Sequence, residues 1–168
     1  KTNIKLLFVP TREIGRIMHV YKNSVLKYNP RSFLELTSNL VNKDIEASIR
    51  EQDSNEFALF NNGVTIISDE TKVSSNTAKP DTAQIILRNP QLVNGGQTAY
   101  TLSRIYGECS TPKDFAVFKG KEVLLRVITF VGQPTADTSE GRLALLGAIS
   151  KASNSQTKVD EADRRSND

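Results

Sequence analysis

The chain has 168 residues, of which 38% are hydrophobic and 24% are charged, and its formal net charge is +3. These values are typical of a globular domain and exclude a disordered chain, and no apolar run approaches the ~20 residues that a membrane-spanning helix needs. One cysteine and one histidine exclude an internal disulfide and the usual zinc-ligand spacings, so we expect no metal site. Because a long apolar run is missing, we also expect no membrane segment. We interpret the chain as an excerpt of a longer protein.

The first thirty residues predict a strand followed by a helix. Residues 4–9 are a short apolar run typical of a strand. Apolar residues at helical spacing then predict an amphipathic helix over residues 12–22, with Thr11 as its N-cap. Seven of the first 31 residues are basic and one is acidic. This charge is compatible with a surface that faces a nucleic-acid backbone, and equally with an ordinary solvated helix face.

A helix and a β-hairpin are expected next. Residues 42–49 carry isoleucines one helical turn apart, which predicts a helix with a buried side. In residues 57–67, two β-rich runs flank Asn61-Asn62-Gly63. Asn and Gly tolerate the positive φ that a hairpin turn needs, so this pattern predicts a hairpin. Only one of the two asparagines is needed for the turn, and the second is either part of it or a displayed hydrogen-bonding group.

The second half of the chain predicts alternating strands and helices. The expected elements are an exposed excursion or loosely paired strand over residues 69–83, a strand over 84–93 that Asn89-Pro90 interrupts, a helix from 99 to about 107, a strand over 121–130 and a helix over 143–149. The alternation predicts a single domain of class α/β or α+β, with a mixed β-sheet and flanking helices. The strand over 121–130 is apolar enough to be central.

The strongest candidate for chemistry is Asn94-Gly95-Gly96-Gln97-Thr98, at a strand-to-helix junction. Paired glycines permit a tight turn and the close approach of a ligand. The N–H groups at a helix start favour an anion such as phosphate, and the side chains of Gln97 and Thr98 can add hydrogen bonds. The lysine of a Walker-type loop is missing. The segment therefore predicts either a phosphate-binding turn or a plain turn into a helix.

A polar tail follows residue 152. Its amides can recognise base edges or a peptide backbone, and Arg165 can bind a phosphate or carboxylate with its guanidinium fork, although charged runs are usually solvated faces. No His-Glu-x-x-His and no serine-centred elbow occurs in the sequence. Pro80-Asp81 could open a nuclease pattern of the restriction type, but no Glu-x-Lys follows it to close the pattern. Catalytic residues, cofactors and the oligomeric state are therefore left unassigned.

Four motifs together resemble the AIPR family of bacterial abortive-infection, phage-resistance proteins. In chain order they lie at residues 57–67, 87–98, 153–156 and 163–168. The resemblance covers residues 26–168, so we expect an AIPR-like domain core there, preceded by an amino-terminal strand and helix over residues 1–25. It implies a cytoplasmic phage-defence protein.

The resemblance also implies a ligand-binding set of polar, mostly amide, groups. Its members are Asn61, Asn62, Gly63, Asn94, Gly95, Gly96, Gln97, Thr98, Asn154, Gln156, Asp163, Arg165, Asn167 and Asp168. Amides do no acid–base chemistry at neutral pH, so this set suits recognition better than catalysis. We expect its loops, at residues 61–63, 94–98 and 154–156, to converge on one face.

The leading hypothesis is therefore a module that binds nucleic acid or a nucleotide, with a phage component as a further candidate partner. The alternative is part of a nuclease or nucleoside triphosphatase whose catalytic centre is completed outside this segment. In that case Asp163 and Asp168 would supply metal-binding carboxylates.

Overall fold

The structure is a computed structural model of the whole chain. It describes residues 2–27, 29, 41–51, 56–74, 83–130, 141, 143–144, 146–149 and 151–152. The elements are, in chain order, β1 (Thr2–Pro10), α1 (Thr11–Tyr21), η1 (Lys22–Val25), α2 (Val41–Arg50), α3 (Phe57–Phe60), β2 (Val64–Ser68), β3 (Glu70–Ser74), β4 (Gln84–Arg88), β5 (Gln91–Asn94), α4 (Gly96–Glu108), η3 (Asp114–Phe118) and β6 (Glu122–Phe130). The fold class is α+β with a mixed sheet, which confirms the prediction.

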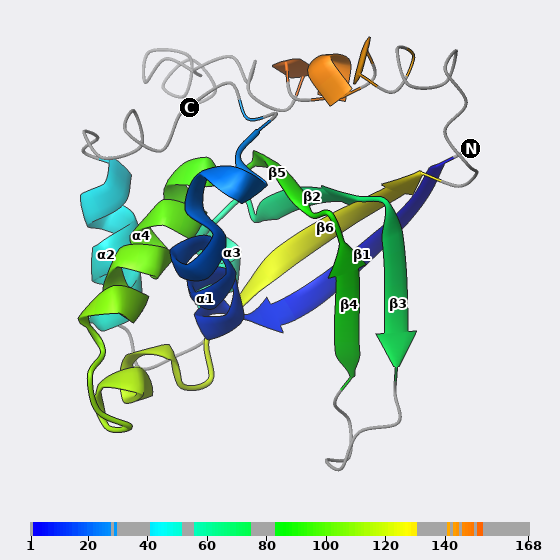
Figure 1. Cartoon of the computed structure of the whole chain (residues 1–168). Coiled ribbons are helices and arrows are strands. Elements are labelled where there is room, and N and C mark those ends of the chain that lie inside the picture. The colour runs from blue at the N-terminus through cyan, green and yellow to red at the C-terminus, as the bar shows by residue number, and fades with distance from the viewer. Residues whose placement is uncertain are drawn as a thin grey trace, which may run out of the picture.

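A four-stranded sheet with the order β1-β6-β2-β5 forms the framework (Figure 1). β6 pairs antiparallel with β1 and parallel with β2, so the predicted central position of this strand is confirmed. β5 pairs antiparallel with β2. β3 and β4 form a separate antiparallel ribbon, which projects away from the helices in Figure 1. The amino-terminal strand β1 is thus part of the same sheet as β2, β5 and β6.

The main core lies between one face of this sheet and helices α1, α2 and α4. Met18 of α1, Ile49 of α2 and Leu102 of α4 are almost fully buried there, against Val123 and Val127 of β6. Because side chains alternate along a strand, the neighbouring residues of the sheet face the other way. On that opposite face a smaller cluster joins the sheet to the segment around residues 141–152, which is helical wherever the structure describes it.

α1 and α4 approach each other closely because Gly15 has no side chain at their contact. A Cβ on Gly15 would lie 2.7 Å from the carbonyl oxygen of Leu102. The helices predicted over residues 12–22, 42–49 and 99–107 are all confirmed as α1, α2 and α4.

The hairpin expected over residues 57–67 is wrong. Phe57–Phe60 forms the one-turn helix α3, Asn61 is extended, and only Val64–Ser68 is a strand. A short apolar run has no periodicity that separates a strand from a buried helical turn. Here the fully buried Phe57 packs into the main core, which favours the helical turn.

Two further expectations need correction. Pro10 occupies the N-cap of α1 in place of Thr11, whose hydroxyl instead donates to the carbonyl oxygen of Lys121 at 3.0 Å. The interrupted strand over residues 84–93 is two strands in different sheets, because Asn89 takes a positive φ of 48° between them. The structure also decides between the two alternatives for residues 69–83, an exposed excursion or a loosely paired strand. Glu70–Ser74 is the strand β3, which pairs with β4.

Candidate functional site

The structure brings two of the predicted site segments together, the loop before β2 and the start of α4. The side-chain amide of Asn61 donates from Nδ2 to Thr98 Oγ1 at 3.0 Å, and the Thr98 hydroxyl donates to Asn61 Oδ1 at 3.2 Å. The same Oδ1 accepts the backbone N–H of Gly63 at 3.0 Å. One amide thus fixes the loop and ties it to the first turn of α4.

Two glycines allow these backbones to meet. Gly63 has a φ of 79° and Gly95 a φ of 81°, values that side-chain-bearing residues rarely adopt. A Cβ on Gly95 would lie 2.6 Å from the carbonyl oxygen of Gly63 and 2.9 Å from the Cα of Val64. A Cβ on Gly63 would lie 2.5 Å from the carbonyl oxygen of Leu124. Both glycines are therefore required for the packing of the loop against α4 and β6.

The start of α4 is the second part of the candidate site. Its N-cap, Gly95, offers no side-chain cap, and the turn contains no acidic residue. The N–H of Gly95 is held by Asn94 Oδ1 at 2.7 Å, and the first helical bond runs from the N–H of Ala99 to the carbonyl oxygen of Gly95 at 2.9 Å. The N–H groups between these two belong to the positive end of the helix dipole.

Two amide side chains beside this turn are available for recognition. Asn62 is exposed and Gln97 is half-buried, and neither side chain hydrogen-bonds to the residues that the structure describes. Thr98 differs, because it is buried and its hydroxyl is occupied by Asn61. Asn61, Gly63, Gly95 and Thr98 therefore build the site, and Asn62 and Gln97 are displayed at it.

Asn29 is a residue that the predicted set did not include. Its side-chain amide donates to the carbonyl oxygen of Leu92 at 3.1 Å, on the strand that leads into the Asn94 turn. The sequence signal was its place in an Asn-Pro pair, which indicates a turn but not its partner.

The remaining predicted site residues lie outside the described part of the chain. They are Asn154, Gln156, Asp163, Arg165, Asn167 and Asp168. The convergence of the loops is therefore established for residues 61–63 and 94–98 and stays a prediction for residues 154–156. Within the described residues, no three His, Cys, Asp or Glu side chains gather as a metal site would require, and none of the helices has the length and apolarity to cross a bilayer.

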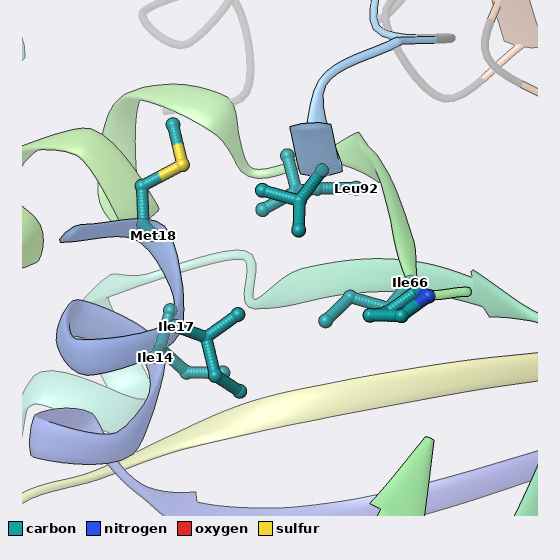
Figure 2. A pocket seen from close by; sticks show the side chains of 7 residues that line it. Ile14, Ile17, Met18, Ile66 and Leu92 are labelled. Atoms are coloured by element: carbon teal, nitrogen blue, oxygen red, sulfur yellow. The ribbon is translucent and has the colours of Figure 1, made fainter. Parts of the chain in front are cut away.

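An apolar gap near the site is too small to hold a ligand. It lies between α1, η1 and the strands β2 and β5 (Figure 2), and its volume is about 10 Å³. The residues that line it are Ile14, Ile17, Met18, Val25, Ile66, Pro90 and Leu92. A volume of this size is at the lower limit for one water molecule, and an apolar lining gives that water no partner. We interpret it as a packing gap.

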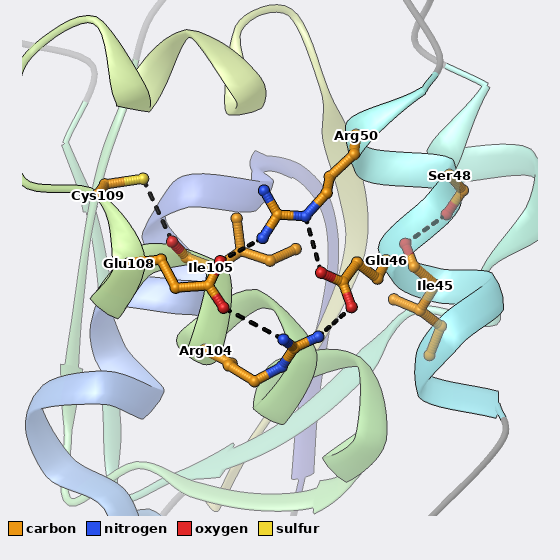
Figure 3. A network of polar contacts seen from close by, with 8 residues as sticks. All are labelled: Ile45, Glu46, Ser48, Arg50, Arg104, Ile105, Glu108 and Cys109. Carbon is orange, nitrogen blue, oxygen red and sulfur yellow. Dashed lines mark hydrogen bonds and ion pairs between the residues drawn. The ribbon is translucent and has the colours of Figure 1, made fainter.

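A four-membered ion-pair network holds α2 against α4 (Figure 3). Arg50 pairs with Glu46 at 2.8 Å and with Glu108, and Arg104 pairs with Glu108 at 3.2 Å and with Glu46. Burial alone would raise the pKa of Glu46, but hydrogen bonds and charge from the two arginines outweigh it and hold that pKa below its usual value. The network joins α2 to the C-terminal end of α4, and the candidate site lies at the other end of that helix.

Comparison with known proteins places the chain by family. A family model described as AIPR protein matches residues 26–168, which is most of the chain. No curated protein and no solved structure shows a significant match.

Proposed function

Because the chain belongs to the AIPR family, which indicates an abortive-infection or phage-defence protein, we propose that it binds nucleic acid or a nucleotide in this defence. The observation that carries the proposal is the meeting of the Asn61–Gly63 loop with the uncapped start of α4. The proposed contact is a phosphate group at the first turn of α4.

Phosphate chemistry fits this turn. A helix start offers several N–H donors and a partial positive charge, and both stabilise a phosphate more than a neutral ligand. Nothing in the turn competes, because its N-cap is a glycine and it has no carboxylate.

The displayed amides supply a means of recognising a base or sugar. Each amide carries two donors and one acceptor, and amides of Asn and Gln pair with the edges of bases. Beside this turn, Asn62 and Gln97 are the two amides whose side chains make no hydrogen bond to the residues described.

The segment that follows α1 carries basic residues and contacts β5, the strand that leads to the site. Gln91 of β5 donates to the carbonyl oxygen of Ser24 at 3.0 Å, so the segment after α1 runs beside β5. That segment carries Lys22 and Lys27, both exposed. Lysines near a phosphate site raise the affinity for a polyanion in a salt-dependent manner.

The experiment is a binding titration with fluorescent single- and double-stranded DNA and RNA at low and high salt, together with thermal shift in the presence of nucleotides. Gln97→Glu places a carboxylate in the first turn, where it favours the helix dipole but repels a phosphate. Gln84→Glu is the matched control, because Gln84 is an exposed amide on β4 in the other sheet.

We expect binding that weakens at high salt, and a loss of roughly tenfold or more in affinity for Gln97→Glu but not for Gln84→Glu. The thermal stability of Gln97→Glu should be equal to or above that of the original chain. No binding at low salt and no thermal shift with any nucleotide would overturn the proposal. Equal losses in the two variants would show that any binding depends on net charge and not on this turn.

A further inference from the structure

Three aromatic rings and an arginine meet where α1 packs against the end of α4 and against η3. The rings of His19 and Tyr106 are 5.5 Å apart between centroids, and those of Tyr106 and Phe115 are 5.2 Å apart. The guanidinium of Arg12 lies over the Phe115 ring, 4.1 Å from its centroid. Arg12 and His19 are exposed, and Tyr106 and Phe115 are half-buried. We call these four residues the ring surface.

The ring surface is assembled from three segments of the chain. Arg12 and His19 lie about two turns apart on α1, and therefore on the same side of that helix. Tyr106 comes from the end of α4 and Phe115 from η3. Gly107 makes room for the His19 ring, because a Cβ there would lie 2.8 Å from His19 Cε1. The basic amino-terminal stretch thus meets rings from the second half of the chain, which its own sequence does not predict.

The charge of the ring surface comes from Arg12, whose side chain has no acidic partner among the described residues. The acidic side chains of the same three elements are engaged elsewhere. Glu13 of α1 pairs with Arg16 at 2.9 Å. Glu108 of α4 belongs to the ion-pair network, and Asp114 of η3 accepts two backbone N–H groups. Arg12 therefore offers its N–H groups to an anion, from a position that the contact with the Phe115 ring holds.

We propose that the ring surface binds a single-stranded nucleic acid, with unpaired bases on the rings and a phosphate on Arg12. Aromatic rings stack on every kind of base, and a guanidinium both stacks on rings and binds phosphate with its fork of N–H groups. The rings are tilted by 47° and 62° to one another and are more than 5 Å apart. The bases of a duplex are parallel, about 3.4 Å apart, and covered by their neighbours, whereas unpaired bases can turn to meet tilted rings.

The ring surface and the candidate site lie at opposite ends of α4. Gln97 and Tyr106 are about 14 Å apart along the axis of that helix, at 1.5 Å per residue. The present inference shares with the proposed function only the class of partner, and it does not require a phosphate at the start of α4. Variants at the two ends therefore test the two contacts separately.

The test is a fluorescence-anisotropy titration of the intact chain with labelled oligo(dT), oligo(rU) and a DNA duplex of the same length. Arg12→Gln should weaken the binding of single strands roughly fivefold or more, and its matched control is Arg88→Gln, which removes the same charge from an exposed position of β4. His19→Ala should weaken it by a similar factor, with Phe8→Ala as the control that removes an exposed ring from β1. Both oligomers should bind, because stacking needs no 2′-OH, and both should bind more tightly than the duplex.

A single tryptophan reports the stacking directly. The chain contains none, so Tyr106→Trp keeps a ring at this position and introduces the one fluorophore of its kind. Its emission should be quenched by oligo(dT) in a saturable way, because a stacked base contacts the indole. Tyr106→Phe, which also keeps the ring, should bind as the original chain does. Thermal denaturation of each variant shows that the fold is retained.

Three results would overturn the ring surface. They are equal affinity for single strands and duplex, equal losses for Arg12→Gln and Arg88→Gln, and tryptophan emission that oligo(dT) leaves unchanged. A loss of binding in Gln97→Glu alone would also overturn it, while leaving the contact at the start of α4 in place. Losses in Arg12→Gln and His19→Ala without a loss in Gln97→Glu would support the ring surface and contradict the other contact.

Discussion

Replacing Asn61 by alanine should destabilise the chain far more than replacing its neighbour Asn62. The Asn61 amide makes three hydrogen bonds, at 3.0 and 3.2 Å to the Thr98 hydroxyl and at 3.0 Å to the N–H of Gly63. Thr98 and Gly63 are both buried, so Asn61→Ala leaves two polar groups without that partner and out of reach of bulk water. At about 1–3 kcal/mol for each such group, we expect a loss of about 3 kcal/mol in the free energy of unfolding.

A double-mutant cycle separates this contact from other effects. Thr98→Val keeps the shape of the side chain and removes its hydroxyl, and we expect it to cost about 1–2 kcal/mol. Because the two residues contact each other, the double variant should show a coupling energy of about 1 kcal/mol. The assay is urea unfolding at 25 °C, with Asn62→Ala as the control that changes stability by less than about 0.5 kcal/mol. An Asn61→Ala loss as small as that of the control, or a coupling energy below about 0.3 kcal/mol, would refute the contact as the link between loop and helix.

Three other predictions concern stability. Gly95→Ala and Gly120→Ala both place a side chain at a positive φ, but only the Cβ of Gly95→Ala would meet other atoms within 3 Å. In thermal denaturation, Gly95→Ala should therefore lower the free energy of unfolding by about 1–3 kcal/mol more than Gly120→Ala, and equal losses would contradict the close packing of the loop. Glu46→Gln should cost less than about 1 kcal/mol near neutral pH. The pKa of Glu46 is lower in the folded than in the unfolded chain, so its contribution to the free energy of unfolding is complete above the unfolded pKa and is lost as the pH falls through the folded pKa. In urea unfolding, the stability difference between the original chain and Glu46→Gln should therefore shrink below about pH 4. A stability difference that stays constant down to about pH 3 would count against the network. Leu92→Ala enlarges the apolar gap and should lower the free energy of unfolding by about 2–5 kcal/mol in the same assay. Ile86→Ala, at an exposed position, should lower it by less than about 0.5 kcal/mol, and similar losses for both variants would show that the residues around the gap are not closely packed.

The periodic elements of this fold could be predicted from the sequence. α1, α2 and α4 each repeat apolar residues at helical spacing, and β6 is a long apolar run that has to be central. Residues 57–60 could not be assigned in this way, because four consecutive apolar or small residues fit a strand and a helical turn equally. Their conformation is decided by the burial of Phe57 in the main core, which is a tertiary contact.

The meeting of the loops at residues 61–63 and 94–98 could be predicted from the sequence, but the contacts that join them could not. The Asn-Gly and Gly-Gly-Gln-Thr segments indicate special backbone conformations, and Gly63 and Gly95 do adopt them. The division of roles between Asn61 and Asn62 depends on which of them reaches Thr98, 37 residues further along the chain. Such a contact follows from the order of β2 and β5 in the sheet, and that order is not encoded in local periodicity.

The most direct test of the proposed function is an amide chemical-shift titration of the isotope-labelled chain with the nucleic acid or nucleotide that binds best. A phosphate at the first turn of α4 should shift the backbone resonances of Gly96, Gln97 and Thr98 and the side-chain resonance of Asn62, in a saturable way and more weakly at high salt. Shifts confined to the β3–β4 ribbon, or no shift at the start of α4 at saturating ligand, would contradict the account.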